Sequence, residues 1–141
     1  MKKTFVVIGA LIVVAGLATC GGLYAWLQSH KDELNRAAKE SLRDGAHFGD
    51  GKDAAACVGE AEARLLHVDG VIAEASNKVF LEGCLKTASL PAGFCEGIPP
   101  RSELRQSIAW AATRCHNEAA SDAQRCGRLI GAVQERCEAR R

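Results

Sequence analysis

The sequence predicts an all-α protein in which an N-terminal membrane helix or signal segment precedes a small, disulfide-linked module of four helices arranged as two hairpins. Three observations predict this class. An uninterrupted apolar segment fills residues 5–27, apolar residues beyond residue 53 recur three and four positions apart, and six of the seven cysteines follow the apolar segment. Such spacing indicates amphipathic helices. An even set of cysteines in a short exported domain is typical of a disulfide framework in an oxidising compartment.

The apolar segment at residues 5–27 predicts where the protein resides. Lys2 and Lys3 precede it, and as a helix it would span roughly 34 Å at about 1.5 Å per residue, enough to cross a bilayer. Tyr24 and Trp26 lie at its far end, where an interfacial aromatic anchor is expected. We therefore expect an uncleaved signal anchor that contacts the lipid bilayer through residues 5–27.

A second interpretation of this segment is a lipoprotein signal. The run Leu17-Ala18-Thr19-Cys20 resembles the bacterial lipobox, which ends in a lipid-modified cysteine, and Cys20 is the odd cysteine of the seven. Thr19 departs from the small residue usual before that cysteine, and the apolar run continues to Leu27, where a lipoprotein would become polar. A third interpretation is a secretory signal removed near Ala18. The sequence leaves all three open.

Residues 28–52 are predicted to form a helical stalk followed by a flexible linker. Up to residue 43 the apolar side chains follow helical spacing in one thin stripe. This stripe consists of Leu34, Ala37, Ala38 and Leu42. Residues 44–52 hold three glycines among polar residues, which is typical of a helix stop and a linker. The predicted domains are the membrane segment at 1–27, the stalk and linker at 28–52, and the module at 53–141.

The first predicted hairpin begins at Asp53, whose side chain is suited to cap a helix N-terminus. A helix then runs to about His67, the Asp-Gly pair at residues 69–70 breaks it, and a second helix covers about 71–86. The expected inner faces are Val58, Ala61, Leu65 and Val68 in the first helix and Ile72, Ala75, Val79 and Phe80 in the second.

Residues 88–100 contain five glycines and prolines and are predicted to be a connecting loop. A loop of this length in a small domain is often functional. Cys95 is expected to fix the loop, while Phe94 and Ile98 are expected to reach the core. We take Phe94 and Ile98 as the candidate partner-binding loop.

The second hairpin is predicted after Pro100. Its first helix aligns Leu104, Ile108, Ala111 and Cys115 on one face. The sequence Ser121-Asp122-Ala123-Gln124 has the spacing of a capping box and is expected to open the second helix. The inner face of that helix is predicted to hold Cys126, Leu129, Ile130, Val133 and Cys137.

Hairpin geometry favours one disulfide pairing among the fifteen that six cysteines allow. In an antiparallel hairpin that turns near residue 69, the residue facing Cys57 lies within a turn of Cys84. A turn near residues 119–120 likewise places Cys115 opposite Cys126, which leaves the remaining two to pair. The favoured pairs are Cys57–Cys84, Cys95–Cys137 and Cys115–Cys126, each contributing roughly 2 to 4 kcal/mol to stability.

No catalytic, cofactor-binding or metal-binding motif emerges from the reactive residue types. Cys115-His116 has the ending of a haem-attachment site, but residue 112 is alanine where that site needs cysteine. The four histidines lack metal-ligand spacing, and no Cys-x-x-Cys pair occurs. They are His30, His47, His67 and His116. We therefore expect no cofactor, no metal and no enzymatic activity.

Charge is divided unevenly along the chain. Residues 44–96 carry four basic and nine acidic side chains, whereas residues 97–141 carry eight arginines and five acidic side chains. Such asymmetry suits either a basic binding surface or two halves that dock on each other. The arginines are not interleaved with aromatic stacking residues, so nucleic-acid binding is not expected.

These patterns predict a single-pass membrane protein with its C-terminal module on the periplasmic or extracellular face. The expected role is structural or protein-binding, with an unidentified envelope protein as partner. The alternatives are a small-ligand-binding or enzymatic periplasmic domain, and a lipoprotein lipidated at Cys20.

Overall fold

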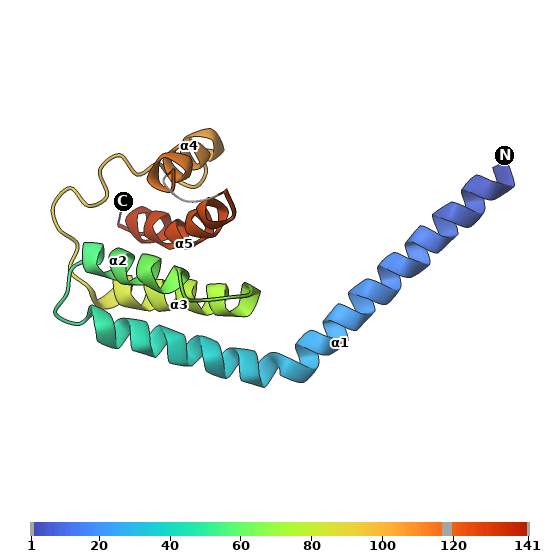
Figure 1. Ribbon diagram of the computed structural model, residues 1–141, viewed down its shortest axis with the longest axis horizontal. Coiled ribbons are helices and arrows are strands. Elements are labelled where there is room, and N and C mark those ends of the chain that lie inside the picture. Colours follow the sequence, from blue (N-terminus) through green and yellow to red (C-terminus); the bar gives the residue numbers. More distant parts are fainter. Residues whose placement is uncertain (1, 117–119, 141) are drawn as a thin grey trace. The chain divides into compact units, whose positions relative to one another are not determined.

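The computed structural model describes the backbone of residues 2–116 and 120–140, and the side chains of residues 16, 19–26, 28–116 and 122–140. Its helices are α1 (Lys2–Gly49), α2 (Ala54–Leu65), α3 (Val71–Thr87), α4 (Leu104–Arg114) and α5 (Ala120–Glu138) (Figure 1). The described residues form no strand beyond one isolated bridge between Asp53 and Ser89. The predicted all-α class is confirmed for them. The chain divides into two compact units, Met1–Arg36 and Ala37–Arg141.

The first unit, residues 1–36, is helical from Lys2 onward as part of α1. Most side chains of the predicted membrane segment at 5–27 lie outside the described residues, as do Leu17 and Ala18 of the lipobox-like run. Among the side chains that are described, no helix combines the length and the apolar character needed to span a membrane. Cys20 carries an exposed free thiol.

The second unit begins at Ala37, because the last turns of α1 pack against α3. This corrects the predicted flexible linker at residues 44–52: the helix continues through Gly45 and ends at Gly49, both buried. A Cβ atom on Gly45 would lie 2.0 Å from the carbonyl oxygen of Phe80, and one on Gly83 would lie 2.2 Å from that of Leu42. These glycines therefore allow two helix backbones to approach closely. Gly45 therefore does not end α1, and the predicted helix stop lies later in the segment, at Gly49.

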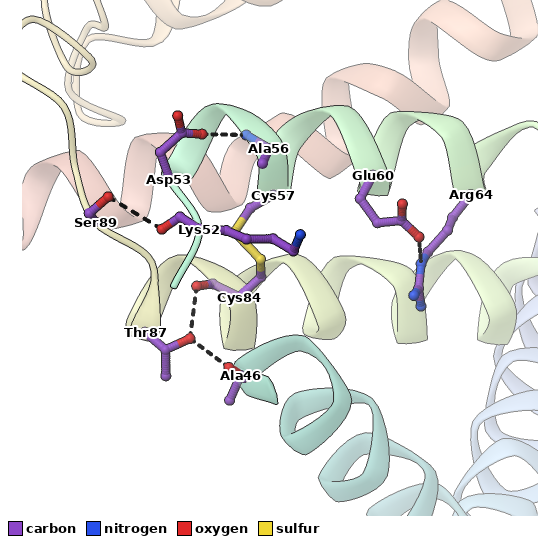
Figure 2. The surroundings of a disulfide bond; sticks show 10 residues. All are labelled: Ala46, Lys52, Asp53, Ala56, Cys57, Glu60, Arg64, Cys84, Thr87 and Ser89. Atoms are coloured by element: carbon purple, nitrogen blue, oxygen red, sulfur yellow. Dashed lines mark hydrogen bonds and ion pairs between the residues drawn. A yellow bond between two sulfur atoms is a disulfide. The ribbon is translucent and has the colours of Figure 1, made fainter. Parts of the chain in front are cut away.

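The predicted first hairpin is present as α2 and α3. Asp53 is the N-cap of α2, since its side chain accepts a hydrogen bond of 2.8 Å from the backbone nitrogen of Ala56 (Figure 2). Val58, Ala61 and Leu65 are buried as expected. On α3 the buried face differs from the prediction in its first half, because the buried residues begin only at Asn77. Ile72, predicted to be inside, is half exposed.

Helix α5 is the centre of the second unit and contacts α2, α3 and α4. Its predicted inner face is buried, including Leu129, Ile130 and Val133. The helix begins at Ala120, one residue before the predicted capping position Ser121, whose side chain lies outside the described residues.

Helix α4 presents a different face from the one predicted. Leu104 and Ile108 remain 68% and 60% exposed, and no residue of this fully described helix is buried. The reason lies on α5, where buried Gln134 donates a hydrogen bond of 3.0 Å to the hydroxyl of Ser107. A buried amide needs a polar partner. Helix α4 is therefore oriented with Ser107, and with Trp110 beside it, toward α5.

Candidate functional site

Three disulfides hold the second unit together: Cys57–Cys84, Cys95–Cys137 and Cys115–Cys126. They are the pairs that the hairpin geometry predicts. The first joins α2 to α3 (Figure 2), the second joins the 88–100 loop to the end of α5, and the third joins α4 to the start of α5. Each helix of the predicted module is thus cross-linked to another element.

Phe94 and Ile98, the candidate partner-binding residues, line a groove of about 320 Å³ between the 88–100 loop, α2, α4 and α5. We call it the apolar groove. Its apolar side chains are Val58, Phe94, Ile98, Trp110, Ile130 and Val133. Glu96 and Arg114 add one acidic and one basic group to the lining. Val58, Ile98, Ile130 and Val133 are buried, so the accessible lining is mixed, with Phe94 and Trp110 beside the exposed Glu96 and Arg114. Apolar and aromatic side chains with a few polar groups are the usual lining of a binding cleft.

Buried hydrogen bonds fix the walls of the apolar groove. The side-chain nitrogen of Gln134 donates to the carbonyl oxygen of Pro99 at 3.1 Å as well as to Ser107, so α5 holds the end of the loop and α4 together. The hydroxyl of Ser107 donates to the carbonyl oxygen of Pro100 at 3.0 Å. Ile98 and Trp110 both line the groove, together with Ile130 and Val133 of α5.

An ion pair joins α2 to α4 and includes Arg114, one of the groove residues. A guanidinium nitrogen of Arg114 lies 3.1 Å from a carboxylate oxygen of Glu62. Both side chains are at least one third exposed, so the pair is weak and open to solvent screening. The same arginine lines a second, more polar hollow of about 270 Å³ that also includes Asp122 and Arg125.

Arg125 ties the start of α5 to the turn between α2 and α3. Its guanidinium donates to the carbonyl oxygen of Leu65 at 3.0 Å and to that of Val68. Its Nε lies 2.8 Å from a carboxylate oxygen of Glu74. The hydrogen bond from Arg128 to Glu74, together with the charges of Arg128 and Arg125, holds the pKa of the Glu74 carboxyl below its ordinary value of 4.5. We call Arg125, Arg128 and Glu74 the arginine clasp.

A third hollow, of about 470 Å³ and open to solvent, has a mixed lining that includes Asp44, Arg64, His67 and Asn77. Arg64 is held by Glu60 at 2.8 Å and lies over the ring of Phe80, 3.6 Å from the ring centroid. The amide oxygen of Asn77 is buried and has no hydrogen-bond partner among the described residues. No group of three or more histidine, cysteine, aspartate or glutamate side chains in the described chain is placed to hold a metal ion.

Sequence reasoning missed one exposed apolar surface. Leu66, Val71 and Ile72 surround the turn between α2 and α3 and are 70%, 82% and 50% exposed. The signal for it was present as apolar residues on both sides of the Asp-Gly pair at 69–70. The helical periodicity of α3 instead predicted that Ile72 is buried, because it places Ile72 on the same face as Phe80.

Fold and site together define the class of this protein as a disulfide-linked all-α module with an apolar groove. No protein-family model, no curated protein and no solved structure matches the chain.

Proposed function

We propose that this protein is a membrane-tethered, extracytoplasmic interaction module whose apolar groove binds an apolar segment of an envelope protein. The observation that carries the proposal is that two disulfides, Cys95–Cys137 and Cys115–Cys126, each cross-link two elements that line the groove, while Cys57–Cys84 joins the remaining wall, α2, to α3. Disulfides form and persist in oxidising compartments, which supports a module outside the cytoplasm. The apolar segment at residues 5–27 would supply the tether.

The composition of the groove supports a protein partner. Trp110 and Phe94 are both partly buried at its edge, and aromatic side chains dominate the binding energy of many protein interfaces. Because disulfides and buried hydrogen bonds already order the walls, little conformational entropy remains to be lost on binding. A preformed apolar groove therefore suits a short apolar segment better than a flat surface would.

The location is tested by counting thiols in the full chain, purified from cells without reductant. Labelling with a maleimide should modify Cys20 at most, and after denaturation and reduction it should modify six further cysteines. Intact mass would also show whether Cys20 carries a lipid or residues near Ala18 have been removed. Six freely reactive cysteines before reduction would contradict the proposed location.

The groove is tested with a photo-cross-linking amino acid placed in cells at Glu96, which lines it. The matched control is Gln106, an exposed residue of α4 that is not part of the groove lining. We expect a discrete adduct of one envelope protein from position 96, absent from position 106 and lost when Trp110→Ala is added. Equal adducts from both positions would contradict a role for the groove.

A small-ligand-binding domain is the second candidate function, favoured by the third hollow with its unpartnered Asn77 oxygen. A buried acceptor without a donor is unfavourable, and a ligand that displaced the side chains over this oxygen and donated a hydrogen bond to it would relieve it. The test is thermal denaturation with a panel of polar metabolites. A ligand-induced rise in melting temperature that Asn77→Leu abolishes would favour this candidate over the interaction module.

A further inference from the structure

The turn between α2 and α3 carries three exposed apolar side chains within residues 66–72. Leu66, Val71 and Ile72 are 70%, 82% and 50% exposed. Single exposed apolar residues are ordinary, but three around one glycine turn form a local apolar projection. We call it the apolar tip. Gly70 has a positive φ of 90°, so the chain reverses sharply there and brings the residues before and after it to the same end.

The apolar tip lies at the end of the second unit where the chain enters at Ala37. Residues 37–49 of α1 run parallel to α3, because Gly45 abuts Phe80 and, further along, Gly49 abuts Thr87. The first residue of α3 therefore lies at the end from which α1 enters. We call this end of the second unit the Ala37 end. The course of α1 and α3 within residues 37–141 can be followed in Figure 1.

The 88–100 loop lies at the opposite end of the unit. Helix α5 runs parallel to α3, with Arg125 beside Glu74 and Glu135 beside Lys78. The C-terminal part of α5 holds the loop through the Cys95–Cys137 disulfide. Leu104, at the start of α4, belongs to this loop end, because the backbone nitrogen of Arg101 donates to Glu138 and Ser107 bonds Gln134.

We propose that the apolar tip rests in the surface of a lipid bilayer and gives the module a second membrane contact. This inference depends on the membrane tether proposed above. Only residues 28–36 separate the apolar segment from Ala37, and as the helix they form they measure about 14 Å at roughly 1.5 Å per residue. A tether this short keeps the Ala37 end close to the bilayer.

The chemistry of the apolar tip fits a lipid interface rather than an anionic surface. Leu66, Val71 and Ile72 offer side chains that partition into the boundary between headgroups and acyl chains. Glu74 and Asp122 pair with Arg125 and Arg128, two acidic groups with two basic ones, and the remaining ionisable groups on the turn are His67 and Asp69. No excess of positive charge is present there, so contact should not require anionic lipid. The arrangement would direct the loop end and its groove away from the membrane.

The test uses the full chain in phosphatidylcholine vesicles with benzoylphenylalanine at one of three positions. Val71 reports on the apolar tip, Leu104 is the equally apolar and exposed control at the loop end, and Val13 reports on the tether. We expect lipid adducts, detected by mass spectrometry, from positions 13 and 71 and only background from position 104.

Every other outcome contradicts the membrane tether or the membrane contact of the apolar tip. Adducts from position 13 with equal yields from 71 and 104 would overturn the tip contact and leave the tether standing. No adducts from position 13 would overturn the tether and the inference with it. A second variant controls for attraction of the probe itself to lipid. With the probe at position 71, Leu66→Ser and Ile72→Ser together should lower the yield of lipid adducts to that of position 104. Unchanged yield there would also overturn the tip contact.

Discussion

Helices α3 and α4 are both amphipathic in sequence, yet the fold holds them very differently. Helix α3 is linked to α2 by a disulfide, packs backbone to backbone against α1, and has Phe80, Leu81 and Leu85 fully buried. Helix α4 lies on the surface with none of its residues buried and is held at its C-terminal end by the Cys115–Cys126 disulfide. Burial and close packing set local stability. Helix α4, which lines the groove, is therefore held at fewer points than α3, which belongs to the core and does not line the groove.

Removing a disulfide should reveal this difference most strongly. Cys57→Ala with Cys84→Ala opens a link across 27 residues, and Cys115→Ala with Cys126→Ala opens one across 11. Loop-closure entropy predicts losses of about 3.5 and about 3 kcal/mol in the free energy of unfolding. Denaturant titration measures both. Hydrogen exchange should show amides throughout the unit accelerated by the first change, and those of 104–114 preferentially by the second. Equal acceleration of α3 and α4 by the second would contradict the comparison.

The backbone contact between α1 and α3 should be nearly as sensitive. Gly45→Ala forces a Cβ to within 2.0 Å of the Phe80 carbonyl oxygen, so the helices must separate. We expect a loss of about 3 kcal/mol in the free energy of unfolding. The matched control is Gly59→Ala on α2, which meets no atom within 4 Å and should gain up to about 1 kcal/mol from helix propensity. Similar effects at both positions would show that the contact does not form.

Two arginines allow a smaller effect to be compared between the core helices and α4. Arg125→Ala removes hydrogen bonds from the carbonyl of Leu65 at the end of α2 and from that of Val68 in the following turn, and should cost about 2 kcal/mol. Arg114→Ala removes the exposed pair between α4 and Glu62 and should cost about 0.5 kcal/mol or less. Melting temperatures of the two variants measure the contrast. An equal loss of stability in the two variants would show that α4 is held as firmly as the end of α2.

The arginine clasp also predicts a modest dependence of stability on pH. Because the folded protein holds the pKa of Glu74 below 4.5, this group stabilises the fold fully above about pH 4.5 and loses that contribution as pH falls through the lowered value. Glu74→Gln should remove this part of the acid sensitivity. Thermal denaturation between pH 7 and pH 3 tests it, and parallel pH profiles of the two proteins would contradict it.

Local sequence signals predicted the helices and the two hairpin cysteine pairs because both depend on neighbours along the chain, whereas Cys95–Cys137, 42 residues apart, followed only by elimination. Asp53 caps α2 through a residue three positions away, and each hairpin brings its own cysteines together. The sequence alone does not distinguish a glycine that ends a helix from one that lets a second helix backbone approach closely. It therefore wrongly predicts that Gly45 belongs to a linker. Its partners, Phe80 and Cys84, are far along the chain.

The face of α4 and the apolar groove required tertiary information for the same reason. Leu104 and Ile108 satisfy helical periodicity. The buried amide of Gln134, however, donates a hydrogen bond to Ser107, so α4 directs Ser107 rather than these two residues toward α5. Phe94 and Ile98 were identified from the loop, whereas Trp110 joined them only through the packing of α4 on α5. A groove formed by four elements leaves no periodic signal in any one of them.

The parallel course of α1 and α3 has a mechanical consequence. Tension applied along α1 at Ala37, against a load held at the loop end, would slide the two helices past each other rather than peel them apart. Gly45 and Gly83 lie at neighbouring levels of that sliding contact and Gly49 lies further along it, and at each of them the two helix backbones meet directly. All of these contacts must then rupture together. The junction is thus arranged to transmit a pulling force from the start of the unit into its cross-linked centre.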